Sequence, residues 1–277
     1  FLNLVLRPEV WINQLSYLYN LESIGISIDS SGKLFMVEYS SPNTNKPLHL
    51  GHLRNIFLGD AVVSLLKSVG HKVVRTQIIN DRGIHICKSM VAWTQLGNGE
   101  TPEISGLKGD HLVGKYYVLF DKIYKKQVAS LISSGMNEEE AKNNAQILKD
   151  AQEMLIKWEQ NDSDVIALWE KMNGWVYNGF ERTYQSLNIS FDHLYYESNT
   201  YKVGKSEVEN GLAEKKFYKK GDQSIWCDLS SYKLDDKLLI RSDGTSVYMT
   251  QDIGTAIQRF RDYPSLSGVV YTVGNEQ

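Results

Sequence analysis

The chain has 277 residues, 42% of them hydrophobic and 23% charged, which is the composition of an ordinary soluble globular protein. Its net charge of -3 provides no overall basic surface for nucleic acid, so such a partner would need local patches. No run of apolar residues reaches the ~18–20 that a membrane span requires. The two cysteines, Cys87 and Cys227, form no C-x-x-C pair, so we expect reduced thiols in a cytoplasmic protein.

The first part of the chain predicts a βαβ unit. Residues 1–33 are interpreted as a lead-in, with a short helix opened by Pro8. Hydrophobic periodicity then predicts a strand, a helix and a strand, at residues 35–39, 51–69 and 73–79. Such a unit forms a parallel strand pair with a right-handed crossover. Residues 34–95 are therefore predicted to be the first half of an α/β fold.

The middle of the chain, residues 96–190, is predicted to be a largely helical insertion. Helical spacing of apolar residues continues through three long segments, at residues 116–134, 138–160 and 164–187. Asn137 followed by Glu140 is a start of the capping-box kind for the second of them. Three consecutive helices interrupt the βαβ pattern and predict an inserted layer.

Strand signals return in the last part, residues 191–277, which is predicted to be the second half of the fold. They lie at residues 194–196, 225–227 and 238–240. The Asp243-Gly244 turn is expected to fold Ile240 back on residues 247–249, before a helix and a final strand at 269–273. The element order predicts a Rossmann-like α/β nucleotide-binding fold with a parallel sheet, divided by the helical insertion.

The loop between the first strand and the first long helix has the chemistry of a phosphate site. It reads PNTNKPLHLGH over residues 42–52. Gly51 allows close approach of the backbone, and the helix start presents unpaired N–H groups to an anion. His49 and His52 can donate hydrogen bonds to phosphate oxygens in a transition state, and Asn43 and Lys46 supply further donors.

These residues carry a specific resemblance. His-Leu-Gly-His at 49–52 resembles the HIGH signature of class I aminoacyl-tRNA synthetases, and the wider run 37–55 is similar to the arginyl-tRNA synthetase family. Residues 80–83 are similar to the family's N-D-x-G segment, with Arg82 where a tryptophan is expected. Residues 242–253 are similar to its D-G-x-x-x-Y-x-T-x-D stretch, with Gln251 where arginine is common.

The resemblance implies a class I synthetase catalytic domain that activates L-arginine with ATP and charges tRNA(Arg). Mg²⁺ would be carried with ATP, and no metal would be held by the protein itself. A guanidinium demands carboxylate partners and favours an aromatic face. The implied arginine-binding residues are Glu38, Asn43, Tyr248, Asp252 and Gln277. Tyr248 and Asp252 would share one face if their segment is helical, and we expect a monomer.

The family's second signature, which is KMSKS-like, has no match here, nor do its anticodon-binding domain and most of its N-terminal tRNA-binding domain. We therefore expect a fragment of a longer enzyme that is itself a poor catalyst. Two alternatives stay open. The first is another class I synthetase or nucleotidyltransferase, because H-x-G-H alone is shared among them. The second is a non-catalytic tRNA-binding module, which an ATP-binding measurement would separate from an enzyme.

Overall fold

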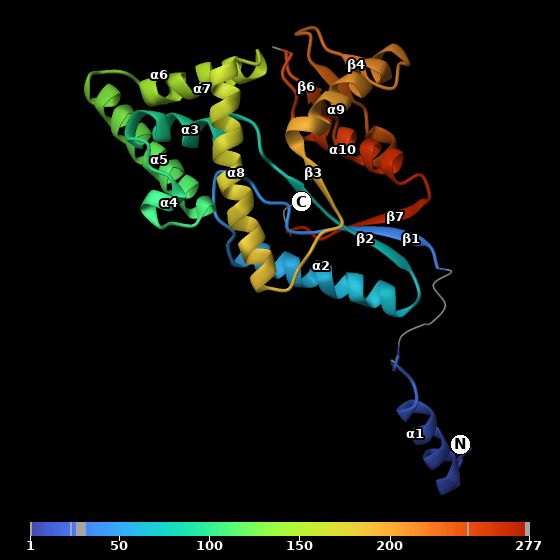
Figure 1. The fold of residues 1–277 in the computed structure, drawn as a ribbon. Coiled ribbons are helices and arrows are strands. Elements are labelled where there is room, and N and C mark those ends of the chain that lie inside the picture. Colours follow the sequence, from blue (N-terminus) through green and yellow to red (C-terminus); the bar gives the residue numbers. More distant parts are fainter. Residues whose placement is uncertain (1, 23, 26–31, 243, 275–277) are drawn as a thin grey trace.

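A four-stranded parallel sheet forms the centre of the computed structural model, which describes residues 2–22, 24–25, 32–242 and 244–274 (Figure 1). Its strands, in spatial order, are β3 (His193–Tyr196), β2 (Lys72–Ile79), β1 (Leu34–Glu38) and β7 (Leu266–Tyr271). The chain moves outward from β1 to β2 and β3, and then returns to the other side of β1 as β7. This reversal creates a switch point at the carboxyl ends of β1 and β7, where open α/β sheets bind ligands.

The predicted βαβ unit is confirmed. Helix α2 (Leu50–Ser68) joins β1 to β2, which pair in parallel register. Met36 and Val37 of β1 are fully buried. Gly59 permits close contact between α2 and the end of β1, since a Cβ there would lie 2.3 Å from the ring of Tyr39. The sheet and α2 thereby hold the intervening loop, residues 40–49, against the carboxyl edge.

A layer of helices separates β2 from β3, as expected for the insertion. It contains α3 (Ile84–Leu96), α4 (Pro102–Ser105), α5 (Gly109–Ser133), α6 (Glu138–Asn144), α7 (Gln146–Glu159) and α8 (Ser163–Ser186). The Asn137 side chain accepts a hydrogen bond from the Glu140 N–H at 2.8 Å, which confirms the predicted cap. The single helix expected over residues 138–160 is wrong, because Ala145 has an extended ψ of 122° and divides it. Helix α3 is an additional element that packs on α5 and α7.

The second half of the fold places two crossed helices beside a small sheet. Helix α9 (Glu197–Ala213) leads to antiparallel strands β4 (Tyr218–Lys219), β5 (Ile225–Cys227) and β6 (Lys237–Ile240), with a 3₁₀ turn at Ser230–Tyr232, and α10 (Tyr248–Asp262) follows. Helices α9 and α10 cross closely at Gly204 and Gly254; a Cβ on Gly204 would lie 1.9 Å from the Thr250 carbonyl oxygen.

The strand expected at residues 247–249 is wrong. Tyr248 begins α10, and the return of the chain onto β6 is limited to an isolated bridge between Ile240 and Ser246. Asp243 of the predicted turn lies outside the described residues. The Thr250 hydroxyl donates to the carbonyl oxygen of Leu239, which fixes the first turn of α10 on β6. This contact favours a helix despite the strand propensity of valine and tyrosine.

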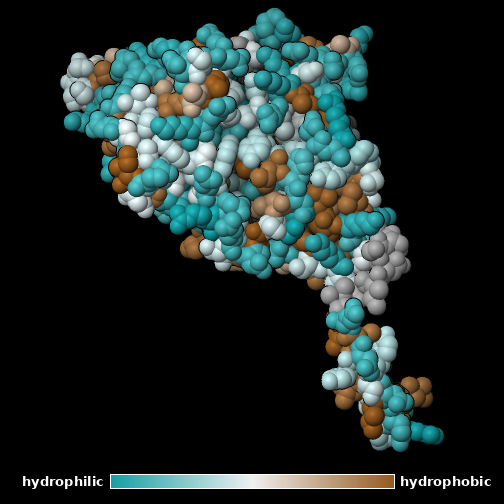
Figure 2. All heavy atoms as spheres, viewed as in Figure 1, coloured by the Kyte–Doolittle hydropathy of each residue, from teal (hydrophilic) through white to brown (hydrophobic). Residues whose placement is uncertain are grey.

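The lead-in helix, α1 (Pro8–Tyr19), stands apart from the α/β body (Figure 1). Apolar side chains lie exposed along it among polar ones (Figure 2). They include Trp11 and Leu15, which are 62% and 68% exposed. Among the residues that the structure describes, no helix combines the length and apolar character needed to cross a bilayer.

Candidate active site

The loop after β1 is fixed to the edge of the sheet by backbone hydrogen bonds to Asn80, which follows β2. The Asn80 N–H donates to the Pro42 carbonyl at 2.9 Å, and the Thr44 N–H donates to the Asn80 carbonyl at 3.0 Å. Ser40 and Ser41 reach positive φ values of 73° and 45°, which turn the chain sharply out of β1. The predicted phosphate loop therefore begins at the switch point.

His49 and His52 form a reciprocal cap at the start of α2. The Nδ1 atom of His49 accepts from the Gly51 N–H at 3.1 Å, and the Nδ1 atom of His52 accepts from the His49 N–H at 3.1 Å. An imidazole that accepts at Nδ1 carries its proton on Nε2 when neutral. Both rings are thus oriented with an Nε2–H donor available, and their centroids lie 3.9 Å apart.

The electrostatics around His52 favour its neutral form. Burial is the largest cause that lowers the pKa of His52, and with the smaller effects of the neighbouring His49 and Lys46 it brings that pKa to about 4. At neutral pH, His52 is therefore a hydrogen-bond donor and carries no formal charge. The positive charge for a phosphate ligand comes instead from Lys46 and from the helix start.

Gly51 is required for the orientation of His49. A Cβ at position 51 would lie 3.0 Å from the His49 ring, closer than ordinary van der Waals contact. Gly51→Ala is expected to weaken ATP binding about tenfold, because small displacements of positioning groups cost up to ~10²-fold. Since alanine favours exposed helical positions by about 0.5–1 kcal/mol, the melting temperature should not fall.

Calorimetric titration with Mg-ATP and a thermal melt check this prediction. Gly174→Ala in α8 is the matched control, since a Cβ there meets no atom within 4 Å among the described residues. The control should keep wild-type ATP affinity. Equal ATP affinity in Gly51→Ala and the control would contradict the role given to Gly51.

Acidic side chains gather at the first turns of α9 and α10. Asp252 lies one helical turn after Tyr248 on α10, so the predicted shared face is confirmed as helical spacing. Burial raises the pKa of Asp252. Burial also raises the pKa of Glu197 to about 7, where the Arg82 charge lowers it and the charges of Asp81 and Asp252 raise it. The charge of Asp252 thus reaches Glu197, and these two carboxylates are called the acid pair below.

Glu197 was absent from the residues predicted from sequence. It follows β3 directly, at the same carboxyl edge as the phosphate loop. A carboxylate at the end of a parallel strand would have been the signal, but α9 itself was not foreseen.

Glu38 has an internal partner. Its carboxylate forms a buried ion pair with Arg259 of α10 and accepts from the Ser41 hydroxyl at 3.2 Å. Arg259 is 1% exposed and lies 5.3 Å from the ring centroids of both Tyr195 and Tyr271. The ion pair anchors α10 to β1, so Glu38 has a structural contact beside the substrate role expected for it.

The predicted residues fall into two groups. The first is contiguous and surrounds the start of α2: Asn43, Lys46, His49, Gly51 and His52. The second comprises Glu38 at the end of β1, with Tyr248 and Asp252 on α10, which Arg259 ties to that strand. The ion pair between Arg259 and Glu38, at the carboxyl end of β1, brings α10 to that edge of the sheet. Gln277 lies outside the described residues.

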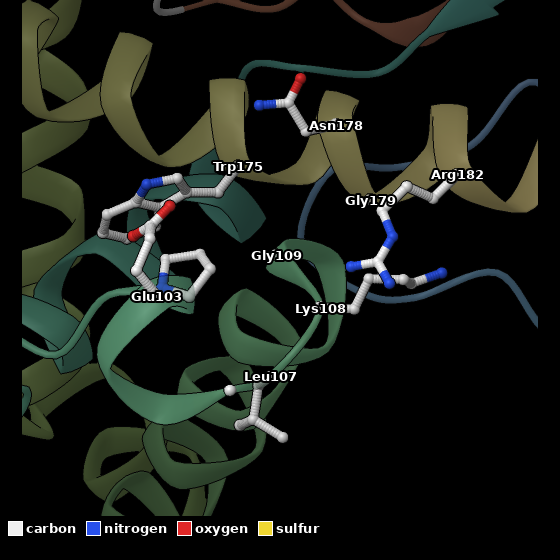
Figure 3. Close-up of a pocket in the computed structure, with 10 residues that line it drawn as sticks. Glu103, Leu107, Lys108, Gly109, Trp175, Asn178, Gly179 and Arg182 are labelled. Atoms are coloured by element: carbon white, nitrogen blue, oxygen red, sulfur yellow. The ribbon is translucent and has the colours of Figure 1, made fainter.

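A cavity of about 270 Å³ opens elsewhere, between the start of α5 and α8 (Figure 3). Lys108 and Arg182 approach one another on one side of it, and Glu103 lies beside Trp175 (Figure 3). Its lining includes none of the predicted site residues within the described part of the chain. The open edge at α2, and not this cavity, is therefore the candidate active site.

A parallel sheet with an H-x-G-H turn at its switch point defines a nucleotide-binding domain of the class I synthetase kind. The comparison with protein families narrows this class. Residues 21–277 match the family "tRNA synthetases class I (R), catalytic domain", and the chain belongs to that family.

Curated relatives agree with this assignment. The chain is 56% identical to the arginine–tRNA ligases of Bacteroides fragilis and Flavobacterium psychrophilum over 278 residues, covering 100% of this chain and 46% of each relative. It is 55% identical to that of Amoebophilus asiaticus, again covering 46% of the relative. The chain thus spans about half the length of the curated relatives that it matches.

Solved structures support the fold. The arginyl-tRNA synthetase of Plasmodium falciparum superposes with a TM-score of 0.68 at 23% identity, covering 96% of this chain and 43% of that one. The enzyme of Thermus thermophilus gives a TM-score of 0.61 at 22% identity, covering 91% and 39%. The predicted Rossmann-like fold with a parallel sheet is confirmed.

Proposed function

We propose that the chain is the catalytic core of an arginyl-tRNA synthetase, which forms arginyl-adenylate from L-arginine and ATP and transfers arginine to tRNA(Arg). One observation carries the proposal: the histidine turn at the start of α2 and an acid pair, of which Glu197 is buried and Asp252 is exposed, lie on elements that meet at a single sheet edge. On this proposal the protein acts as a cytoplasmic monomer.

The acid pair suits a guanidinium. Asp252 and Glu197 accept hydrogen bonds from its planar fork, and the ring of Tyr248 lies against its face. Glu38 and Asn43 bind the ammonium end of the substrate, with Glu38 shared between that ammonium and Arg259. Gln277 retains the arginine-binding role implied by the family resemblance. An uncharged analogue would cover both carboxylates, including the buried Glu197, without pairing them, which disfavours its binding.

The activation step needs no covalent enzyme intermediate. The arginine carboxylate oxygen attacks the α-phosphorus of ATP, and the bond to the pyrophosphate oxygen breaks. The Nε2–H groups of His49 and His52 donate to phosphate oxygens as charge develops on them, while Lys46 and the α2 N–H groups add positive potential.

Magnesium fits this site as a companion of ATP. Nitrogen donors dominate the loop, and no three His, Cys, Asp or Glu side chains in the described residues cluster as a metal site. Mg²⁺ prefers oxygen ligands and retains waters, so it would be held mainly by the phosphates. The protein's own contribution is to orient those phosphates through Asn43 and the histidine pair.

Adenylate formation tests the proposal. The chain is incubated with Mg-ATP and tRNA(Arg), with arginine or lysine, and arginyl-adenylate is detected by mass spectrometry. Adenylate that forms with arginine and not with lysine is the expected result. ATP turnover that is independent of the amino acid would contradict the proposal and would favour another nucleotidyltransferase.

A further inference from the structure

Arg82 occupies an enclosed position beside the acid pair. It lies on the connection between β2 and α3, where the family resemblance led us to expect tryptophan. Its guanidinium carbon lies 3.9 Å from the ring centroid of Tyr201 on α9 and 5.4 Å from that of Trp158 on α7. Its NH2 atom donates to Glu159 at 3.2 Å, and its side chain is only 10% exposed. The guanidinium is therefore clamped between α7 and α9.

The clamp leaves one N–H of the guanidinium unpaired. Within the described residues, the buried Nε of Arg82 has no hydrogen-bond partner. A guanidinium carries five N–H donors and a permanent positive charge. Its unpaired N–H group presents that charge to neighbouring side chains. Tyr201 lies one helical turn after Glu197, so the two side chains share one face of α9. Stacking on Tyr201 thus places the Arg82 charge near the Glu197 carboxylate.

The other charges around Glu197 are negative. Asp81 precedes Arg82 in the chain and accepts from the Ser198 N–H at 2.9 Å, from the Ser198 hydroxyl at 2.7 Å and from the Tyr177 hydroxyl at 3.1 Å. Asp252 approaches from α10, and Glu159 from α7 is already paired with Arg82. Arg82 is the cation that the structure places among these carboxylates.

We propose that Arg82 is the resident counter-ion of the amino-acid site, a positioning residue that favours the ionised form of the Glu197 carboxyl while no substrate is bound. This inference rests on the proposed function, in which Glu197 then accepts the guanidinium of arginine. One clamped cation leaves net negative charge on Asp81, Glu197 and Asp252, so the site still attracts a second cation. Tyr201, Trp158 and Glu159 hold Arg82 in place as the substrate enters.

The proposal fixes how arginine affinity should depend on pH when Arg82 is replaced. Burial raises the pKa of Glu197 to about 7, and Arg82 opposes that rise. Removing the Arg82 charge therefore raises this pKa further, and the carboxylate becomes protonated at a higher pH. For a shift of about one unit upward from 7, the ionised fraction at pH 7 falls about fivefold, whereas at pH 9 it changes little. Arginine affinity should follow the ionised fraction.

The test compares wild type with Arg82→Met, which removes the charge, and Arg82→Lys, which retains it. The Glu197 carboxyl is titrated by ¹³C NMR in the ligand-free full chain, and its signal is assigned by its loss in Glu197→Gln. Arginine binding is measured in parallel by calorimetry from pH 6 to pH 9. We expect the midpoint to rise by about one pH unit in Arg82→Met and to stay near wild type in Arg82→Lys.

In the calorimetry, Arg82→Met should bind arginine about fivefold more weakly at pH 7 and within about twofold of wild type at pH 9. In a Glu197→Gln background, Arg82→Met should produce no pH-dependent difference. An unchanged Glu197 midpoint, or an equal loss of affinity at every pH, would overturn the counter-ion role. A shifted midpoint in a chain that never binds arginine would support the counter-ion role and reject the proposed function instead.

Discussion

Replacing Asp252 by alanine is expected to weaken arginine binding about a hundredfold or more. Asp252 lies on the first turns of α10, where burial raises its pKa. Its carboxylate is exposed in the ligand-free chain and is proposed to be covered by the substrate guanidinium. Truncating one partner of a charged pair that is buried in a complex costs about 2–5 kcal/mol. Each 1.4 kcal/mol is about a factor of ten in affinity, so the loss should be large. Calorimetric titration with arginine measures it.

Glu209→Ala is the matched control for this experiment. Glu209 is an exposed carboxylate on α9, the same helix as Glu197. Removing it changes the net charge as Asp252→Ala does, but it should leave arginine affinity within about twofold, since exposed charges interact weakly. ATP affinity should be unchanged in both variants. A similar loss of arginine binding in both would show that overall charge, and not the Asp252 contact, governs binding.

Replacing His49 is expected to lower the rate of adenylate formation about 10²–10³-fold at saturating substrates, as loss of one positioned transition-state donor does. His49 also caps α2, so alanine would confound this loss with one of about 1 kcal/mol in stability. His49→Asn separates the two effects, because asparagine is a preferred cap but cannot reproduce the Nε2–H donor. Rapid-quench measurement of adenylate formation with tRNA(Arg) present gives the rate.

The matching stability measurement is thermal unfolding of His49→Asn, which should stay close to wild type. Arginine affinity should also be retained, because the acid pair lies on α9 and α10. A wild-type rate in a folded His49→Asn variant would contradict the proposed role of the histidine pair. Loss of arginine binding together with the rate would show that the substitution disturbs the whole site.

The part of the fold that sequence predicted best is the part that is covered by apolar residues at regular spacing. The βαβ unit formed by β1, α2 and β2 has such residues, and its ends agree with prediction to within one or two positions. Helix α9 does not. The residues it buries are small or polar, namely Glu197, Thr200, Gly204, Val208 and Gly211, because it crosses α10 at backbone contact. Periodicity of large apolar residues cannot reveal such a helix.

Two further errors have different causes. The break between α6 and α7 falls at Ala145, with neither proline nor glycine at the break to mark it. Residues 247–249 have strand propensity, but the contact from Thr250 to Leu239 directs them into a helix. At residues 247–249, therefore, a tertiary contact overrides the local preference of the sequence.

The candidate site also has one part that the sequence predicted and another that it did not. The phosphate loop is contiguous, so its motif and its position after a strand were visible in the sequence. Glu197, Arg82 and Arg259 were not, because their roles depend on charges brought together from separate elements. Arg82 was visible only as a departure from a family motif, and its clamped position between α7 and α9 gives that departure a physical meaning.

The central claim is that the acid pair at the carboxyl edge selects a guanidinium. Calorimetric titration of the full chain with arginine, lysine and citrulline, each with Mg-ATP present, tests it most directly. We expect a binding heat with arginine. Lysine should bind far more weakly, because its compact ammonium lacks the planar fork, and citrulline should not bind, because it lacks the charge. If the chain binds ATP but binds all three amino acids with equal affinity, or binds none of them, the selection of a guanidinium by the acid pair is contradicted.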